Sequence, residues 1–129
     1  MAMDWNMMAS SSYGAAGLLA QERYERSAVS RAYYAVYSRI AHVLASRGLT
    51  FADGREGPGH EQLADLVLHH LRMLGQYRWY VAEDLRKLYK MRLEADYRPS
   101  HPVGVTDAQK AVRAMNRIFS LTKGAVDER

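Results

Sequence analysis

The sequence contains no cysteine, and this absence removes several kinds of chemistry at once. It excludes disulfides, thiolate metal ligands and a thiol nucleophile. No window of about eighteen residues is free of charged side chains, so we expect no membrane span. The start of the chain, MAMDWNMMASSSYGAAGLLAQ, also lacks a basic segment before a long apolar block. We therefore expect no secretory signal and a cytoplasmic location.

The chain as a whole has the composition of a globular protein. Of the 129 residues, 48% are hydrophobic and 25% are charged. A chain of this length is enough for one domain with a buried core, so we expect a single domain over residues 1–129. The 18 basic and 14 acidic residues give a net charge of +4, which favours an anionic partner without requiring one.

Turn residues divide the chain into segments with helical periodicity. We predict helices over residues 4–20, 23–47, 61–74, 77–97 and 106–124. The second carries one apolar stripe at spacings of three and four: Val29, Tyr33, Val36, Ile40 and Val43. No segment alternates apolar and polar residues persuasively. The prediction is an all-α, antiparallel bundle of four to five helices.

The third and fifth predicted helices also have apolar faces. In the third, the face is Leu63, Leu66, Val67, His70, Leu71 and Leu74. In the fifth, Thr106 and Gln109 have the spacing of a capping box, and the predicted buried face is Ala108, Val112, Met115 and Phe119.

The fourth helix places an arginine in the register of its apolar stripe, which reads Val81, Leu85, Leu88, Arg92 and Ala95. A guanidinium on an apolar face is costly unless it is paired, or unless the face opens onto a wet cleft or an anion. Asp96, one turn later, is the local candidate partner. Two interpretations stay open: a structural ion-pair network and a functional site.

Metal and phosphate sites of the common kinds are not indicated. His69 and His70 are adjacent, so they point in different directions on a helix, and no histidine pair has the four-residue spacing of zinc-binding helices. The stretch GREGPGH reads as a turn rather than as a phosphate-binding loop. We therefore expect no metal and no cofactor.

Three stretches together resemble a known family. They are SAVSRAYYAVYSRIAHVLASRGL at 27–49, GHEQL at 59–63 and RLEADY at 92–97. Their combination and order resemble the HEPN domain, and in particular a small stand-alone prokaryotic branch with Ser-Arg-x-Tyr-Tyr and Arg-x-x-x-Asp-Tyr motifs. The resemblance covers about residues 4–122. It implies an all-α bundle that usually forms a homodimer with a polar cleft along the interface.

The resemblance also implies a chemistry. Many HEPN proteins are metal-independent endoribonucleases that use an arginine followed, after roughly four to six residues, by a histidine. Arg92 matches that arginine, but the histidine positions hold Tyr97, Arg98 and Pro99. His60 could replace the missing base, with Asp96 and Tyr97 orienting it.

Other candidate residues follow from the same resemblance. His101 could fold back over the helix end and act as the base. Arg55 and His60 match the spacing formally, but they lie in a Gly/Pro loop. Ser30, Arg31 and Tyr34 would line the same cleft and contact RNA or a nucleotide.

Two classes of function follow. The first is a HEPN protein that acts on or binds RNA, as a toxin-like, metal-independent endoribonuclease of a two-gene toxin-antitoxin module. The alternative is a non-catalytic subunit that binds a nucleotide or a minimal nucleotidyltransferase, the possible antitoxin partner.

Overall fold

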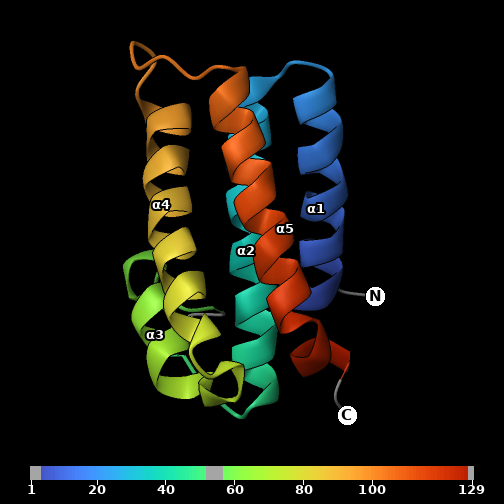
Figure 1. Cartoon of the computed structure of the whole chain (residues 1–129), viewed down its shortest axis with the longest axis vertical. Helices are drawn as coiled ribbons and strands as arrows, with labels where there is room; N and C mark the ends of the chain where they lie inside the picture. Colours follow the sequence, from blue (N-terminus) through green and yellow to red (C-terminus); the bar gives the residue numbers. More distant parts are fainter. Residues whose placement is uncertain (1–3, 52–56, 128–129) are drawn as a thin grey trace.

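The computed structural model describes residues 4–51 and 57–127, and its described part is helical with no strand (Figure 1). Within these residues, five α-helices and two short 3-10 turns follow one another. They are α1 (Trp5–Gln21), α2 (Glu25–Ser46), η1 (His60–Gln62), α3 (Leu63–His70), η2 (Arg72–Leu74), α4 (Tyr77–Tyr97) and α5 (Val105–Asp127). The predicted all-α bundle is confirmed.

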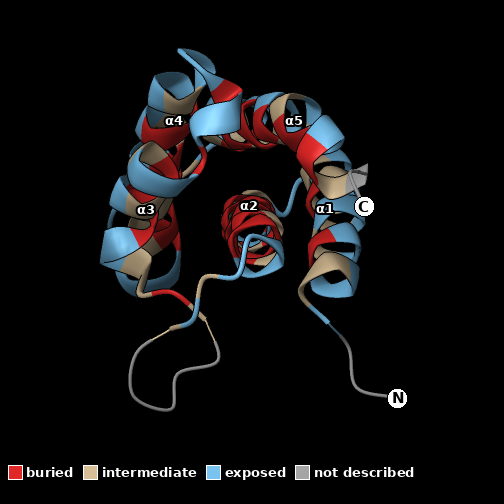
Figure 2. Cartoon of the chain, turned by 90° about the horizontal axis from the view of Figure 1, so that it is seen from below, coloured by how far each residue is buried: buried red, intermediate tan, exposed pale blue. Residues whose placement is uncertain are grey.

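Helix α2 is the centre of the bundle. Viewed along its axis, α1, α5, α4 and α3 form an open ring around it (Figure 2), and α2 packs against each of them. The predicted stripe on α2 is buried, from Val29 to Val43. Ala28, Ala32 and Ala35 are also fully buried, and their small side chains allow neighbouring helices to approach closely.

Helix α3 is shorter than the sequence predicts. Leu71 leaves the helical region, with φ −102° and ψ 51°, and a 3-10 turn follows it. This break lets both Leu71 and Leu74 reach the core, and it leaves His70 exposed, so the prediction of His70 on the buried face was wrong. Gly75, at φ 57°, then takes the left-handed turn into α4.

Helix α5 also differs in detail from its prediction. It begins at Val105, and the Gly104 backbone N–H donates to Asp107 Oδ2 at 2.9 Å. Asp107 therefore caps this end, where the sequence suggested Thr106 and Gln109. The helix continues past Gly124. Its buried face is Ala108, Ala111, Ala114, Met115, Ile118, Thr122 and Ala125, whereas Val112 and Phe119 are only partly buried.

None of the helices in the described ranges has the length and apolar character needed to cross a membrane.

Candidate functional site

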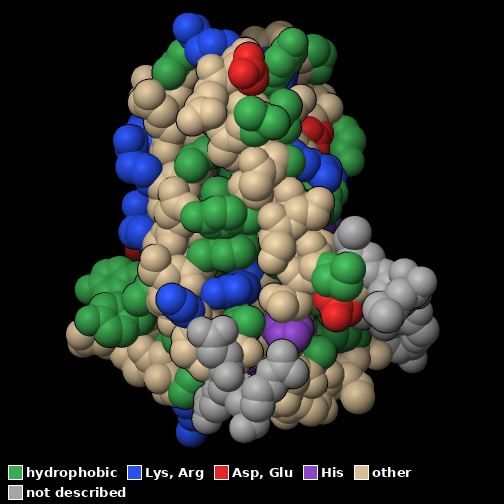
Figure 3. Space-filling model, turned by 90° about the vertical axis from the view of Figure 1, so that its right-hand side faces the viewer, with side chains coloured by type: hydrophobic (Ala, Val, Ile, Leu, Met, Phe, Trp, Pro, Cys, Tyr) green, Lys and Arg blue, Asp and Glu red, His purple; other side chains and the backbone are tan. Residues whose placement is uncertain are grey.

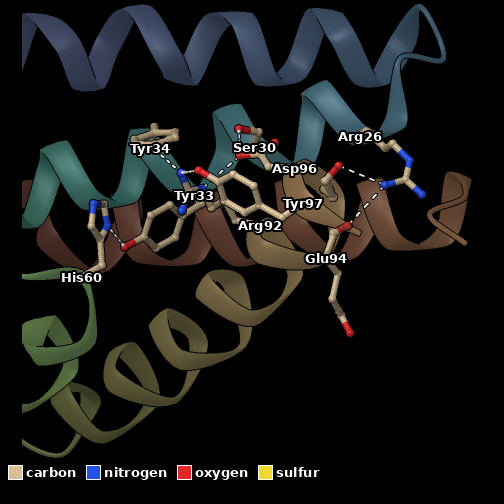
Figure 4. Close-up of polar contacts among 10 residues, drawn as sticks. Arg26, Ser30, Tyr33, Tyr34, His60, Arg92, Glu94, Asp96 and Tyr97 are labelled. Carbon is tan, nitrogen blue, oxygen red and sulfur yellow. Dashed lines mark hydrogen bonds and ion pairs between the residues drawn. The ribbon is translucent and has the colours of Figure 1, made fainter. Parts of the chain in front are cut away.

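Arg92 lies between α4 and α2, with 9% of its surface exposed. Its Nη2 donates to the hydroxyl of Tyr34 at 2.5 Å and to that of Tyr97 at 3.2 Å (Figure 4). The rings of both tyrosines also lie 5.1 Å from the guanidinium carbon. Since Tyr97 is 65% exposed, this cluster borders solvent.

Asp96 completes the charge balance around Arg92. Its Oδ2 lies 3.0 Å from Arg92 Nε, and the Ser30 hydroxyl donates to the same oxygen at 3.1 Å. The Nε–H bond is not aligned with the carboxylate, so this contact is an ion pair without a hydrogen bond. The predicted pair of Arg92 and Asp96 is therefore present. We call Ser30, Tyr34, Arg92, Asp96 and Tyr97 the Arg92 cluster.

The cluster keeps the guanidinium charged. Burial lowers the pKa of Arg92, but the oxygens of Tyr34 and Tyr97 and the Asp96 carboxylate outweigh burial, and the net effect raises the pKa. Nη1 has no hydrogen-bond partner among the described residues. One edge of a fixed cation is thus left to meet an anion.

His60 forms a second group at the start of η1. Its Nδ1 shares a 2.6 Å hydrogen bond with the Tyr33 hydroxyl, and its ring stacks on Tyr37 at 4.6 Å and Tyr89 at 5.8 Å. Burial, and then the nearby charge of Arg92, lower the pKa of His60. Burial raises the pKa of Tyr33. Near neutral pH the imidazole is therefore neutral and Tyr33 keeps its proton.

The Arg92 cluster and the aromatic group around His60 are neighbours, but no hydrogen bond between described residues links His60 to the cluster. The Tyr34 ring lies 6.2 Å from the His60 ring and 5.1 Å from the guanidinium carbon of Arg92, so it contacts both. In the described part of the chain, no hydrogen bond connects His60 to Asp96 or Tyr97, and its hydrogen bond is with Tyr33. The residue that orients His60 is Tyr33, which the sequence reasoning placed in the core without this role.

The remaining predicted residues fall in different places. Arg31 is exposed beside the cluster, with its guanidinium carbon 5.1 Å from the Tyr34 ring. His101 lies past the end of α4, and its Nε2 is 3.5 Å from Glu94 Oε2. Arg55 is outside the described residues.

Arg26 is a positioning residue that sequence reasoning missed. Its Nη1 donates to the carbonyls of Glu94 and Ala95 at 3.2 and 3.0 Å (Figure 4). The same nitrogen donates to the carbonyl of Arg98 at 3.2 Å, and Nη2 donates to those of Pro99 and His101. A cation at this place satisfies carbonyls that a helix end leaves free and opposes the negative end of the helix dipole. Arg26 thereby holds the end of α4 that carries Asp96 and Tyr97. The available signal was its place one turn before Val29, in the register of the buried stripe.

The described residues contain no group of three or more histidine, aspartate or glutamate side chains arranged to hold a metal ion. The chemistry open to this site is that of a fixed cation, a neutral imidazole and tyrosine hydroxyls.

Comparison with known proteins identifies a family. The sequence model of the HEPN domain family matches residues 2–125. No curated protein and no solved structure matches the chain.

Proposed function

The chain belongs to the HEPN domain family, and from this premise we propose that it is an RNA-directed protein that cleaves RNA without a metal ion. The observation that supports this proposal is the way in which the Arg92 side chain is held. Two tyrosine hydroxyls and a carboxylate orient its guanidinium, and Nη1 stays without a partner among the described residues. A planar cation held in this way suits a phosphate diester.

The proposed reaction is attack by a ribose 2′-OH on the adjacent phosphate. A bond forms between the 2′-oxygen and phosphorus, the bond from phosphorus to the 5′-oxygen breaks, and the products carry a 2′,3′-cyclic phosphate and a 5′-OH. Arg92 stabilises the negative charge that builds up on the phosphate. The base removes the 2′-OH proton, and an acid returns a proton to the leaving 5′-oxygen.

His60 is the proposed base. When Nδ1–H donates to the Tyr33 hydroxyl, the Nε2 lone pair is free to accept a proton. The lowered pKa of His60 keeps this nitrogen unprotonated at neutral pH. Ser30 and Tyr34 orient Asp96 and Arg92, and Arg31 lies where it can contact the RNA backbone beside them.

The decisive experiment is incubation of the purified protein with total RNA in chelator, followed by analysis of fragment ends. Arg92→Lys should lower the rate about a hundredfold to a thousandfold, because lysine keeps the charge but loses the planar fork. His60→Ala should lower it by about a hundredfold or more. His101→Ala is the matched control and should change little. Full activity in the His60 variant would remove His60 as the base.

One observation favours a second candidate function. The positions where the family's histidine belongs hold Tyr97, Arg98 and Pro99, and among the described residues no hydrogen bond joins His60 to Asp96 or Tyr97. This arrangement suits a non-catalytic subunit that binds a nucleotide or a minimal nucleotidyltransferase in a two-gene toxin-antitoxin module. Binding of RNA or of that partner, with no cleavage by the wild type, would select this function.

We also propose a homodimer whose interface includes α4, so that a second copy brings its own Arg92 cluster to a shared cleft. Light scattering that shows only monomer at tens of micromolar would contradict it.

A further inference from the structure

Three adjoining hollows lie along the outer side of α5. A hollow of about 700 Å³ shares Asp84 and Arg117 with a second hollow of about 180 Å³, and both lie between α4 and α5. The larger one also shares Asn116 and Ser120 with a third hollow of about 560 Å³, on the α1 side of α5. We call these three adjoining hollows the α5 groove. It contains no residue of the Arg92 cluster.

The α5 groove concentrates the positive charge of the molecule. Two acidic residues line it, and so do six basic ones, Arg39, Lys87, Lys110, Arg113, Arg117 and Lys123. This excess equals the net charge of +4 of the whole chain. Both acids are already paired, Glu83 with Lys87 at 2.8 Å and Asp84 with Arg117 at 3.0 Å. The groove therefore favours an anionic occupant.

Three of these cations are available to such an occupant. Lys110, Arg113 and Lys123 are exposed, and none of them forms an ion pair with another described residue. From Lys110 to Lys123 the helix advances about 20 Å, at the usual rise of an α-helix. This length matches a run of several phosphates better than it matches a single small anion.

Exposed aromatic side chains line the same groove, in the hollow that also contains Arg117. Tyr77 and Tyr80 line the largest hollow, are 49% and 60% exposed, and have ring centroids 6.3 Å apart. Figure 3 shows Lys and Arg side chains in a column along the left edge of the molecule, with a hydrophobic cluster below them at the same edge. Aromatic rings beside a row of cations are the combination that binds unpaired bases and their phosphates.

We propose that the α5 groove binds single-stranded RNA, as a second contact surface separate from the Arg92 cluster. Bases stack on Tyr77 and Tyr80, and phosphates follow Lys110, Arg113 and Lys123 along α5. A base-paired duplex would keep its bases from the tyrosines, so a single strand fits this surface better. The inference rests on the proposed function, because it assumes that RNA is the substrate, and it adds that unpaired segments are preferred.

A probe that resists cleavage separates binding from catalysis. We would measure fluorescence anisotropy with a labelled 2′-O-methyl oligouridylate of about 12 nucleotides, within the length range of single-strand binding sites. This probe lacks the 2′-OH that the proposed reaction requires. Lys110→Glu combined with Arg113→Glu should weaken binding at least about tenfold at low salt and reduce the dependence of affinity on salt. Tyr80→Ala should weaken it about fivefold or more.

Matched controls lie outside the groove. Arg72→Glu combined with Lys90→Glu makes the same change in net charge on exposed residues and should leave binding within about twofold of wild type if the groove is the site. Tyr24→Ala removes a tyrosine that is 62% exposed, as Tyr80 is 60% exposed, and should also leave binding unchanged.

The outcomes separate the two proposals. If the wild type makes no cyclic phosphate ends but binds the probe through Lys110, Arg113 and Tyr80, the proposed cleavage is wrong and the proposed binding surface stands. Groove variants that bind as wild type does, or probe binding that only Arg92→Lys abolishes, would overturn the groove. A change of sedimentation in the groove variants with unchanged RNA affinity would also overturn it, because the groove would then be a contact between copies of the chain.

Discussion

Arg92 and Arg113 are arginines on neighbouring helices, yet their surroundings differ in kind. Arg92 is 9% exposed and is held by two hydroxyls and a carboxylate. Arg113 is exposed and forms no ion pair within the described residues. A buried cation costs desolvation and needs fixed partners, which also fix its direction. An exposed cation costs little, and salt screens its attraction. The Arg92 cluster thus suits one phosphate in one geometry, whereas the α5 groove suits a length of backbone.

The largest expected effect tests this difference through stability. Arg92→Ala should lower the free energy of unfolding by about 3 kcal/mol, because it leaves Asp96 without its cation and two tyrosine hydroxyls without a donor. Arg113→Ala should change it by less than about 0.5 kcal/mol. Urea denaturation of both variants measures the contrast. A loss below about 1 kcal/mol for Arg92→Ala would instead place Arg92 in an open cleft.

The second prediction tests whether an arginine needs full burial to stabilise the fold, or whether fixed hydrogen-bond partners are enough. Arg26 is only half-buried, but it donates to five carbonyls at the end of α4. We expect Arg26→Ala to lower the free energy of unfolding by about 2 kcal/mol, since hydrogen bonds to a charged group are among the stronger ones. Arg26→Lys should recover only part of this, because an ammonium cannot reach carbonyls on both sides.

The control for Arg26 is Arg23→Ala. The Arg23 side chain is 69% exposed and pairs with Glu25 at 3.1 Å, so its loss should cost less than about 1 kcal/mol. Equal losses in the two variants would mean that the carbonyl contacts of Arg26 add nothing to an ordinary surface charge.

The smallest expected effect concerns pH. Because the pKa of His60 is lower in the folded protein than its ordinary value of 6.5, the unfolded chain binds a proton more readily. The stability contributed by neutral His60 is therefore complete above that ordinary value and is lost as the pH falls toward and through the folded pKa. His60→Gln should flatten this part of the curve of unfolding free energy against pH.

The sequence predicted best what depends on spacing along one helix. The stripes of α2 and α4 are buried as predicted, including Arg92, because a period near 3.6 places those positions on one face. The pairing of Arg92 with Asp96 follows from the same geometry. The predicted boundaries of α4 agree with the structure.

Spacing along one helix does not show which distant residues will be partners. The hydrogen bond from Arg26 to Pro99 joins residues 73 positions apart, and the one between Tyr33 and His60 spans 27. The break at Leu71 reflects packing of Leu74 against the core, and local helix propensity does not show it. The predicted face of α5 was wrong in part, because Ala111 and Ile118 are fully buried, whereas Val112 and Phe119 are only partly buried. The Phe119 ring packs against Arg39 of α2 at the edge of the core.

The central place of α2 has a consequence for amide hydrogen exchange. Since α2 packs against α1, α3, α4 and α5, its middle backbone amides can meet solvent only when much of the domain opens. They should therefore exchange at a rate set by global unfolding. The amides of α3, a short helix between two 3-10 turns, should exchange through smaller openings. His60 lies at the start of that segment, so we expect an opening of the segment to release its imidazole from Tyr33 and move it relative to Arg92, while the helix that carries Ser30 and Tyr34 stays folded.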